Sequence, residues 1–276
     1  MSELIEPLCP YTGSKYKLLP QLLPLFPPAK RFVDLFAGGG SVYSNVVDKY
    51  NEILVNDIIA DLIGLQQKLL EDPTGTEDEI ISLKLARDDA EGYKRLRADY
   101  NENPTPAKLF MLMMCCTNNM LRFNKKFRFN QTHGKRTLSP VVLARLHKWV
   151  EQVGAHRNKI QFSAKPFHEV EVKDGDFVLC DPPYSLAEAG YNAYWNSSSD
   201  DAALYQYLVD ADAKGVKFLV CGFERHGEQK SSFLAALEGR GFMKTELVSD
   251  YEHVSRKKQA KNTKEVVFTN YDPKEL

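Results

Sequence analysis

A short apolar run, Phe177 to Cys180, is followed directly by Asp181, Pro182, Pro183 and Tyr184. A brief apolar run that stops at two prolines is typical of a buried strand, because proline cannot donate to a sheet or extend it. The chain must therefore turn after this strand. In open α/β sheets, ligands bind at the carboxyl ends of the strands, so we expect Asp181 and Tyr184 to lie at a functional site.

This turn suits chemistry on an exocyclic amine such as N6 of adenine. The lone pair of that amine is delocalised into the ring, which makes the amine a poor nucleophile. The Asp181 carboxylate and the Pro182 carbonyl could accept its two N–H groups and localise the lone pair, while Tyr184 stacks on the base. The alternative is a strand end with a Pro-Pro turn and an incidental aspartate.

A second predicted strand, Arg31 to Phe36, runs into the glycine turn 37–41, and a helical pattern follows from Val42 to Lys49. Strand, glycine turn and helix form half of a nucleotide-binding unit, because glycine lets the backbone approach a ligand and a helix N-terminus favours polar groups. The spacing is not G-x-G-x-x-G. A nicotinamide-dependent dehydrogenase is therefore disfavoured.

The strand Ile53 to Asn56 ends at Asp57, about 20 residues beyond the glycine turn. An acidic residue at this position is placed to bond ribose hydroxyls. Asp57 could also cap the following helix, predicted from Ile58 to Leu70, since aspartate is a favoured N-cap. Both roles are compatible, because a cap faces the same crevice.

The composition is that of an ordinary globular chain of 276 residues with a net charge of −1. This length suits one large domain or one domain with an insertion. The charge balance requires any nucleic-acid surface to come from local segregation of charge. Five cysteines without framework spacing indicate free thiols in a reducing compartment, and no apolar stretch is long enough to span a membrane. We expect a cytoplasmic protein.

The segment 117–136 contains six basic residues and no acidic one. Three phenylalanines are interleaved with the basic residues, and a hairpin is predicted at 124–126. Basic, aromatic and amide side chains without acids indicate a nucleic-acid-contacting surface. The alternative is an ordinary solvated hairpin.

Around this segment the strand–helix alternation is interrupted. A polar break at 73–78 precedes a charged helical pattern from Glu79 to Tyr100, and apolar and amphipathic helices are predicted at 107–116 and 139–153. The alternation resumes at Ile160, and the loop from Ser185 to Asp200 is a candidate lid. The remaining expected elements are a helix at 16–25, strands at 216–221, 244–251 and 265–268, and helices at 200–213 and 228–240.

The chain resembles the Dam-type DNA adenine methyltransferases over nearly its whole length. The motifs that carry the resemblance, in the family's order, are Y-T-G-S-K, F-V-D-L-F-A-G-G-G-S, N-D at 56–57, G-K-R at 134–136, D-G-D-F-V-L-C-D-P-P-Y and N-T-K-E-V-V-F. The resemblance implies methylation of a flipped adenine at N6 in duplex DNA at G-A-T-C. The methyl donor would be S-adenosylmethionine, released as S-adenosylhomocysteine, and no metal is expected.

The resemblance also implies site residues. Cofactor residues would be Tyr11, Lys15, Asp34, Phe36, Gly38, Asp57, Phe167 and Asp181. The flipped adenine would be held by Asp181, Pro182, Pro183 and Tyr184. DNA contacts would come from Lys15, Asn119, Met120, Arg122, Asn124, Lys135, Arg136 and Tyr191, with Arg136 bidentate to guanine. Two departures, Thr117 in place of an aromatic residue and Thr132-His133 before G-K-R, bear on recognition rather than on catalysis.

We therefore predict a doubly wound α/β fold with a mostly parallel, seven-stranded, Rossmann-like sheet. Residues 1–72 and 154–276 would form the catalytic domain, and 73–153 a mainly helical DNA-recognition domain with a β-hairpin. The expected partner is duplex DNA, bound by a protein that is monomeric in solution and can dimerise on DNA. The expected compartment is the bacterial cytoplasm, or the host cytoplasm if a bacterial virus encodes the chain. The alternatives are a cytosine-N4 methyltransferase and a non-catalytic DNA-binding protein of the same fold.

Overall fold

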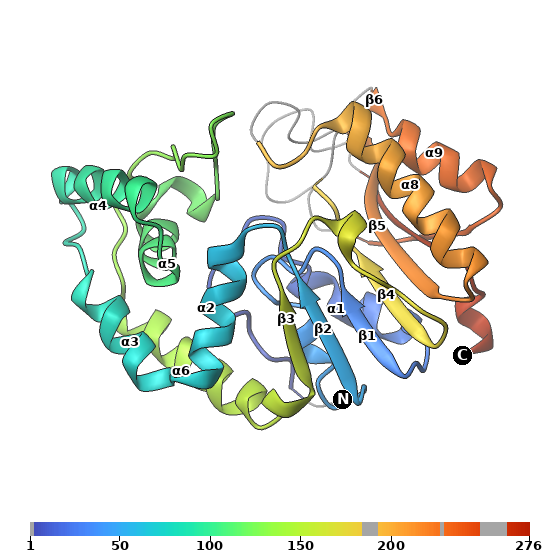
Figure 1. The fold of residues 1–276 in the computed structure, drawn as a ribbon, viewed down its shortest axis with the longest axis horizontal. Coiled ribbons are helices and arrows are strands. Elements are labelled where there is room, and N and C mark those ends of the chain that lie inside the picture. The colour runs from blue at the N-terminus through green and yellow to red at the C-terminus, as the bar shows by residue number, and fades with distance from the viewer. Residues whose placement is uncertain (1–2, 184–192, 227–228, 249–263) are drawn as a thin grey trace.

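A computed structural model describes residues 3–183, 193–226, 229–248 and 264–276. Its centre is a mixed sheet with the strand order β3-β2-β1-β4-β5-β8-β7, and a short strand β6 pairs with β5 (Figure 1). The strands are β1 (Arg31–Asp34), β2 (Glu52–Asn56), β3 (Ile160–Ser163), β4 (Asp176–Cys180), β5 (Lys217–His226), β6 (Gln229–Lys230), β7 (Met243–Glu246) and β8 (Lys264–Thr269).

The strand order reverses between β1 and β4. β1 pairs in parallel with β2 on one side and with β4 on the other, with Asp34 opposite both Val55 and Leu179. β3 and β5 extend this parallel core outwards, while β8 runs antiparallel to both β5 and β7. The predicted doubly wound, mostly parallel sheet is confirmed, and its reversal point is where ligands bind in such folds.

Both faces of the sheet are covered, which explains why its strands are continuous apolar runs. Successive residues alternate between two cores: Phe32 and Phe177 face one, and Val33 and Val178 face the other. The helices are α1 (Leu19–Leu22), α2 (Ala60–Glu71), α3 (Pro73–Ser82), α4 (Ala90–Glu102), α5 (Pro106–Cys115), α6 (Pro140–Gly154), α8 (Ser197–Ala213) and α9 (Ser232–Gly239). The 3₁₀ turns are η1 (Tyr16–Leu18), η2 (Leu23–Leu25), η3 (Tyr43–Asn45), η4 (Thr117–Asn119), η5 (Arg157–Lys159), η6 (Phe167–Glu169) and η8 (Pro273–Glu275).

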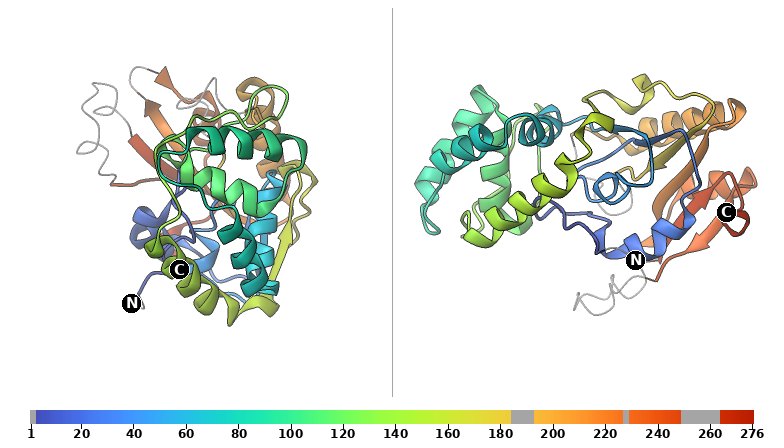
Figure 2. Two further views of the ribbon diagram at one scale, coloured as in Figure 1. Left: turned by 90° about the vertical axis from the view of Figure 1, so that its left-hand side faces the viewer. Right: turned by 90° about the horizontal axis from the view of Figure 1, so that it is seen from below.

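The helices α3 to α6 lie beyond the β3 end of the sheet, next to α2 (Figures 1 and 2). α5 packs against α2, α3 and α4, and α6 packs against α2. The indole of Trp149 on α6 is fully buried and donates to the Ser44 hydroxyl at 2.9 Å. The predicted N-cap of α6 is confirmed, because the Ser139 hydroxyl accepts from the Val142 amide. The helical layer is thus joined to the sheet through one continuous apolar core.

The helical pattern expected from Glu79 to Tyr100 is divided between α3 and α4, and the helix expected at 228–240 begins only at Ser232, after β6. Two further sequence-based expectations were wrong. The segment from Val42 to Lys49 forms only the short turn η3 rather than a helix. Its polar side chains bond backbone carbonyls instead, Ser44 that of Gly40 at 2.7 Å and Asn45 those of Ile5 and Ser41 at 2.9 Å each. Serine and asparagine compete with a helical backbone in this way.

The second error concerns residues 73–78, which were expected to be a polar break. They begin α3, because the Asp72 carboxylate caps the helix by accepting from the Gly75 amide and Pro73 occupies the first turn. Aspartate at the N-cap followed by proline is a helix start signal. The predicted strand 244–251 forms β7 as far as Glu246, and residues 249–251 lie outside the described part of the chain. Of the candidate lid, residues 185–192 lie outside the described part, whereas residues 193–200 are described and lead into α8.

Candidate functional site

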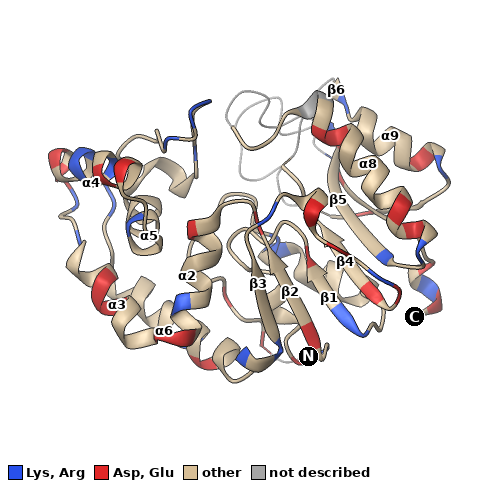
Figure 3. Cartoon of the chain, viewed as in Figure 1, with Lys and Arg blue, Asp and Glu red and all other residues tan. Residues whose placement is uncertain are grey.

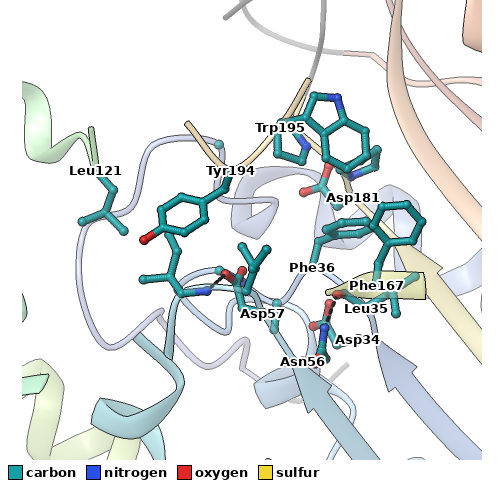
Figure 4. A pocket seen from close by; sticks show the side chains of 18 of the residues that line it. Asp34, Leu35, Phe36, Asn56, Asp57, Leu121, Phe167, Asp181, Tyr194 and Trp195 are labelled. Atoms are coloured by element: carbon teal, nitrogen blue, oxygen red, sulfur yellow. Dashed lines mark hydrogen bonds between the residues drawn. The ribbon is translucent and has the colours of Figure 1, made fainter. Parts of the chain in front are cut away.

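A cavity of about 430 Å³ opens at the carboxyl ends of β1, β2 and β4 (Figure 4). The loops that follow β1, β3 and β4 contribute to it, as do the N-terminal loop and the segment after α5. It therefore lies at the reversal point of the sheet. Its lining includes all eight predicted cofactor residues: Tyr11, Lys15, Asp34, Phe36, Gly38, Asp57, Phe167 and Asp181.

The glycine turn packs directly beneath the ring of Tyr11. A Cβ atom on Gly38 would lie 2.8 Å from Tyr11 Cε1, and one on Gly39 would lie 2.9 Å from Tyr11 Cβ. Gly38 also has a φ of 51°, which favours glycine. The close approach of the two loops thus requires glycine and places the Tyr11 ring at the cavity wall.

The Asp57 side chain joins the glycine turn to the residues just before α2. Its two carboxylate oxygens accept from the Gly38 amide and from the Ile59 amide, each at 2.9 Å. Burial raises the pKa of Asp57, while these backbone hydrogen bonds oppose the rise. Asp57 is not the N-cap of α2, which is Ile59 and has no side-chain cap bond, so the capping role weighed from the sequence is wrong. Its carboxylate instead holds the turn that precedes the helix, and Asp57 also lines the cavity.

Three aromatic rings form one wall of the cavity. Phe36, Phe167 and Trp195 lie with their ring centroids between 5.6 and 5.8 Å apart. The Trp195 indole donates to Asp201 at 3.2 Å, which fixes the orientation of the ring. Aromatic faces of this kind attract organic cations.

Asp181 is held at the cavity by Lys15. The Lys15 ammonium lies 2.8 Å from the Asp181 carboxylate and 3.7 Å from that of Glu265, which is fully buried. Burial acts to lower the pKa of Lys15, but Asp181, the Cys221 thiol and Glu265 outweigh it and raise the pKa. Lys15 is therefore charged, and it links the loop after β4 to β8.

Asp34 is 2% exposed and lies at the end of β1. Its carboxylate accepts from the Tyr43 amide at 3.2 Å. Burial raises the pKa of Asp34 to about 8, and the charges of Asp181 and Asp57 add to that rise, whereas the Tyr43 hydrogen bond opposes it. Several carboxyl groups in one cavity favour a ligand that carries positive charge.

The basic segment 117–136 borders the same cavity. Met120, Leu121 and Phe123 contribute to the lining. The ring of Tyr194, which follows the predicted catalytic turn, packs at 5.2 Å against Phe123 and at 4.9 Å against Phe127. The segment after α5 and the loop after β4 therefore meet at the cavity.

The predicted hairpin at 124–126 is confirmed as a tight turn. A bridge pairs Phe123 with Phe129, and the Asn124 amide donates to the Arg128 carbonyl at 3.0 Å. The Asn124 carboxamide oxygen accepts from the amides of Lys126 and Arg128, so this side chain shapes the turn. Figure 3 shows Lys and Arg residues along the hairpin at the edge of the molecule.

The side chain of Arg136 is hydrogen-bonded to that of Asn119. The Asn119 oxygen accepts from the Arg136 guanidinium, and its nitrogen donates to the Met113 carbonyl at 2.8 Å. Asn119 is buried, whereas Lys135 and Arg136 are exposed. The structure thus shows Asn119 holding Arg136, while the predicted DNA contacts of both residues stay predictions.

The backbone of this segment is strained. Among the described residues, those with positive φ that are not glycine are Asn118, Asn119, Phe127 and Lys135, and all lie between 118 and 135. Such conformations cost about 1–3 kcal/mol each and cluster at functional sites. Gly134 lies close against the backbone that leads into residues 118–119, because a Cβ on it would lie 2.4 Å from the Cys116 carbonyl oxygen.

Sequence reasoning did not assign roles to several lining residues. Asn56 donates to the carbonyls of Leu35 and Lys165 at 3.1 and 3.0 Å and accepts from the Lys165 amide at 3.1 Å, which ties the loops after β1 and β3 together. Tyr194 and Trp195, which also line the cavity, fall within the segment expected to be a lid. The sequence feature that could have identified Tyr194 and Trp195 is the cluster of aromatic residues downstream of the Pro-Pro turn.

The remaining predicted residues divide into two groups. Pro182 and Pro183 line the cavity beside Asp181, and Arg122 is half-buried in the hairpin. Tyr184 and Tyr191 lie outside the described residues. In the described part of the chain, no group of three or more His, Cys, Asp or Glu residues could hold a metal ion, and no helix is long and apolar enough to cross a membrane.

Residues 11–221 match the family model described as D12 class N6 adenine-specific DNA methyltransferase. The chain is 29% identical to the Type II methyltransferase M.FokI of Planomicrobium okeanokoites, over 95% of this chain and 42% of that protein. It is 27% identical to the Modification methylase StsI of Streptococcus sanguinis, over 96% and 42%. It is 26% identical to the DNA adenine methylase of Escherichia coli (strain K12), over 68% and 69%. The chain thus spans less than half the length of the first two relatives.

Proposed function

The chain belongs to the D12 class N6 adenine-specific DNA methyltransferase family, and on that premise we propose that it methylates N6 of a flipped adenine in duplex DNA at G-A-T-C. The observation that carries the proposal is the placement of Asp181. Its carboxylate, held 2.8 Å from the Lys15 ammonium, lines the same cavity as the glycine turn and Asp57.

The residues of the cavity fit S-adenosylmethionine as the methyl donor. Asp57 stands at the end of β2, where an acidic residue binds ribose hydroxyls. The aromatic wall of Phe36, Phe167 and Trp195 suits a sulfonium cation, and the carboxyl group of Asp34 adds negative charge when it ionises. When bound, the cofactor supplies an electrophilic methyl group.

The protein residues act on the adenine by binding and orientation. The target base must leave the helical stack, because its amine is inaccessible within the duplex. The Asp181 carboxylate and the Pro182 carbonyl accept the two N6 hydrogens, which localises the lone pair on nitrogen and aims it at the methyl group. Positioning of this kind supplies much of the rate acceleration. The methylated amine is cationic, and it returns to neutrality by losing one proton.

Recognition is assigned to the segment 117–136. Arg136, raised on Asn119, is exposed and suited to bidentate contact with guanine. Met120 and Arg122 precede Arg136 in this segment, and both are half-buried. Met120 also lines the cavity. The hairpin lysines, which are exposed, suit phosphate contacts.

The test is methyl transfer from labelled S-adenosylmethionine to duplexes that contain G-A-T-C or a single-base variant of it, followed by separation of the labelled bases. We expect N6-methyladenine in the G-A-T-C duplex only. Label in both duplexes would refute the sequence preference, label in cytosine would refute adenine as the target, and no label would refute the activity.

The matched variants are Asp181→Ala and Asp210→Ala. The first removes the acceptor at the cavity and should lower kcat by at least about 100-fold, as loss of one preorganised electrostatic group does. The second makes the same change at an exposed position on α8 and should leave kcat unchanged. Circular dichroism confirms that both variants fold, and near-normal turnover by Asp181→Ala would reject the assigned role.

A further inference from the structure

One face of α4 holds the outer arm of the hairpin by its backbone. Tyr93, Arg97 and Asn101 are spaced four residues apart, so their side chains lie on the same side of the helix. The Tyr93 hydroxyl and the Arg97 guanidinium donate to the Gln131 carbonyl at 3.0 and 3.1 Å. Asn101 binds Phe129, two residues earlier.

The Asn101 side chain makes the two hydrogen bonds to the Phe129 backbone that a neighbouring strand would otherwise make. Its nitrogen donates to the Phe129 carbonyl at 3.0 Å, and its oxygen accepts from the Phe129 amide at 2.7 Å. In the hairpin, the Asn124 amide donates to Arg128 and the Asn130 amide to Arg122. The backbone groups of Phe129 therefore point away from its bridge partner, Phe123, towards α4. One side chain thus satisfies both backbone groups of Phe129.

This contact sets the direction of the side chains that face DNA in the proposed function. Phe129 and Phe123 are 1% and 6% exposed and pack edge to face at 5.6 Å. Successive side chains point in opposite directions along an extended arm. The inward direction of the Phe129 side chain therefore also sets the directions of the residues next to it and of the residues on the paired arm. Arg122 and Asn124 flank Phe123 on the paired arm.

We propose that Asn101 is a positioning residue for target recognition: through its two hydrogen bonds to Phe129, it holds the hairpin 122–130 in the orientation that presents Arg122 and the basic side chains to DNA. The inference rests on the proposed function. Asn101 is not among the described residues that line the cavity, so its loss should leave cofactor binding intact. It should act on the discrimination between target and non-target duplexes.

The experiment compares Asn101→Ala with Asn103→Ala. The control makes the same chemical change two residues later, at the exposed residue that follows α4. Within the described part of the chain, its side chain bonds Asp99 alone. Hydrogen–deuterium exchange of the free proteins reports on the hairpin amides without requiring activity. The ratio of kcat/KM for the best duplex to that for its single-base variants reports on recognition, and calorimetry reports the Kd for S-adenosylmethionine.

We expect Asn101→Ala to speed exchange of the 122–130 amides about 10-fold and to lower the discrimination ratio about 10-fold, since two hydrogen bonds to the hairpin backbone are removed. The Kd for S-adenosylmethionine and all values for Asn103→Ala should stay within about twofold of wild type. Exchange at the wild-type rate, or an unchanged discrimination ratio, would overturn the inference. An inactive wild-type protein would reject the proposed function instead, while the exchange rates would still decide whether Asn101 holds the hairpin.

Discussion

At the scale of single residues, the site is defined by carboxyl groups in different electrostatic settings. Asp181 has a lysine within 2.8 Å, whereas Asp34 has no ion-pair partner among the described residues and relies on a backbone amide. Burial and the neighbouring carboxylates therefore raise the pKa of Asp34 from its ordinary value of 3.8 to about 8. The charged form is destabilised, which is a cost to the fold that a cationic ligand would offset.

This cost predicts how stability depends on pH. Between pH 4 and pH 8 the folded Asp34 carboxyl keeps a proton that the unfolded chain has lost, so its contribution to stability falls as pH rises. Because asparagine does not ionise, Asp34→Asn removes this loss of stability with rising pH. We expect the free energy of unfolding of Asp34→Asn, relative to that of wild type, to increase from pH 4 to pH 8. The increase should be at most about 5 kcal/mol, since one pKa unit corresponds to about 1.4 kcal/mol. Thermal unfolding without cofactor measures this difference. Parallel pH curves would contradict the prediction.

At the scale of elements, the site depends on loops that pack closely rather than on a helix N-terminus. The turn after β1 leads into η3 instead of a helix, and it is held by Asp57, Gln66 and the ring of Tyr11. The Gln66 amide donates to the Gly38 carbonyl at 3.0 Å, and Tyr11 covers Gly38 and Gly39. The ring of Tyr11 can therefore lie against this turn because Gly38 and Gly39 carry no side chains.

Gly39→Ala tests this packing. The new methyl group would lie 2.9 Å from Tyr11 Cβ, so the ring must move away from the cavity wall. Overpacking of this kind costs about 1–3 kcal/mol, and we expect the Kd for S-adenosylmethionine, measured by calorimetry, to rise about 10-fold. Gly239→Ala is the control, because apart from its chain neighbours and the backbone of its own helix, no heavy atom of the described residues lies within 4 Å of the added Cβ. Equal affinities in the two variants would show that Tyr11 does not shape the cavity.

At the scale of the whole molecule, charge is segregated rather than abundant. The net charge is −1, yet residues 117–136 carry six basic side chains and no acidic one. Arg128 is paired with Glu102 on α4, while Lys125 and Lys126 are exposed at the tip of the hairpin. A locally basic surface beside the cavity can attract DNA without making the rest of the protein basic.

Salt dependence measures this contribution. In a binding assay with duplex DNA, Lys125→Gln together with Lys126→Gln should make the plot of log K against log salt concentration shallower, by about 0.9 for each phosphate that a lysine neutralises in the wild-type complex. The exposed Lys214, which follows α8, provides the control, and Lys214→Gln should leave the slope unchanged. If the double substitution does not alter the slope, the hairpin lysines do not bind phosphates.

The sequence by itself determined the local elements of the site. The strand before Asp181 and the glycine turn after β1 were predicted within a few residues, because an apolar run closed by proline or glycine specifies its own beginning and end. It did not determine η3, because the bonds of Ser44 and Asn45 to nearby carbonyls outweighed a helical pattern.

Only the tertiary structure decided which distant residues meet. Asp181 pairs with Lys15 and lies near Glu265 because β4, β5 and β8 are neighbours in the sheet, and α4 holds Phe129 through Asn101 because of how the helices pack. A hydrophobic pattern fixes which face of an element is buried but not which partner covers it. The partners follow from strand order and helix packing, which are properties of the whole chain.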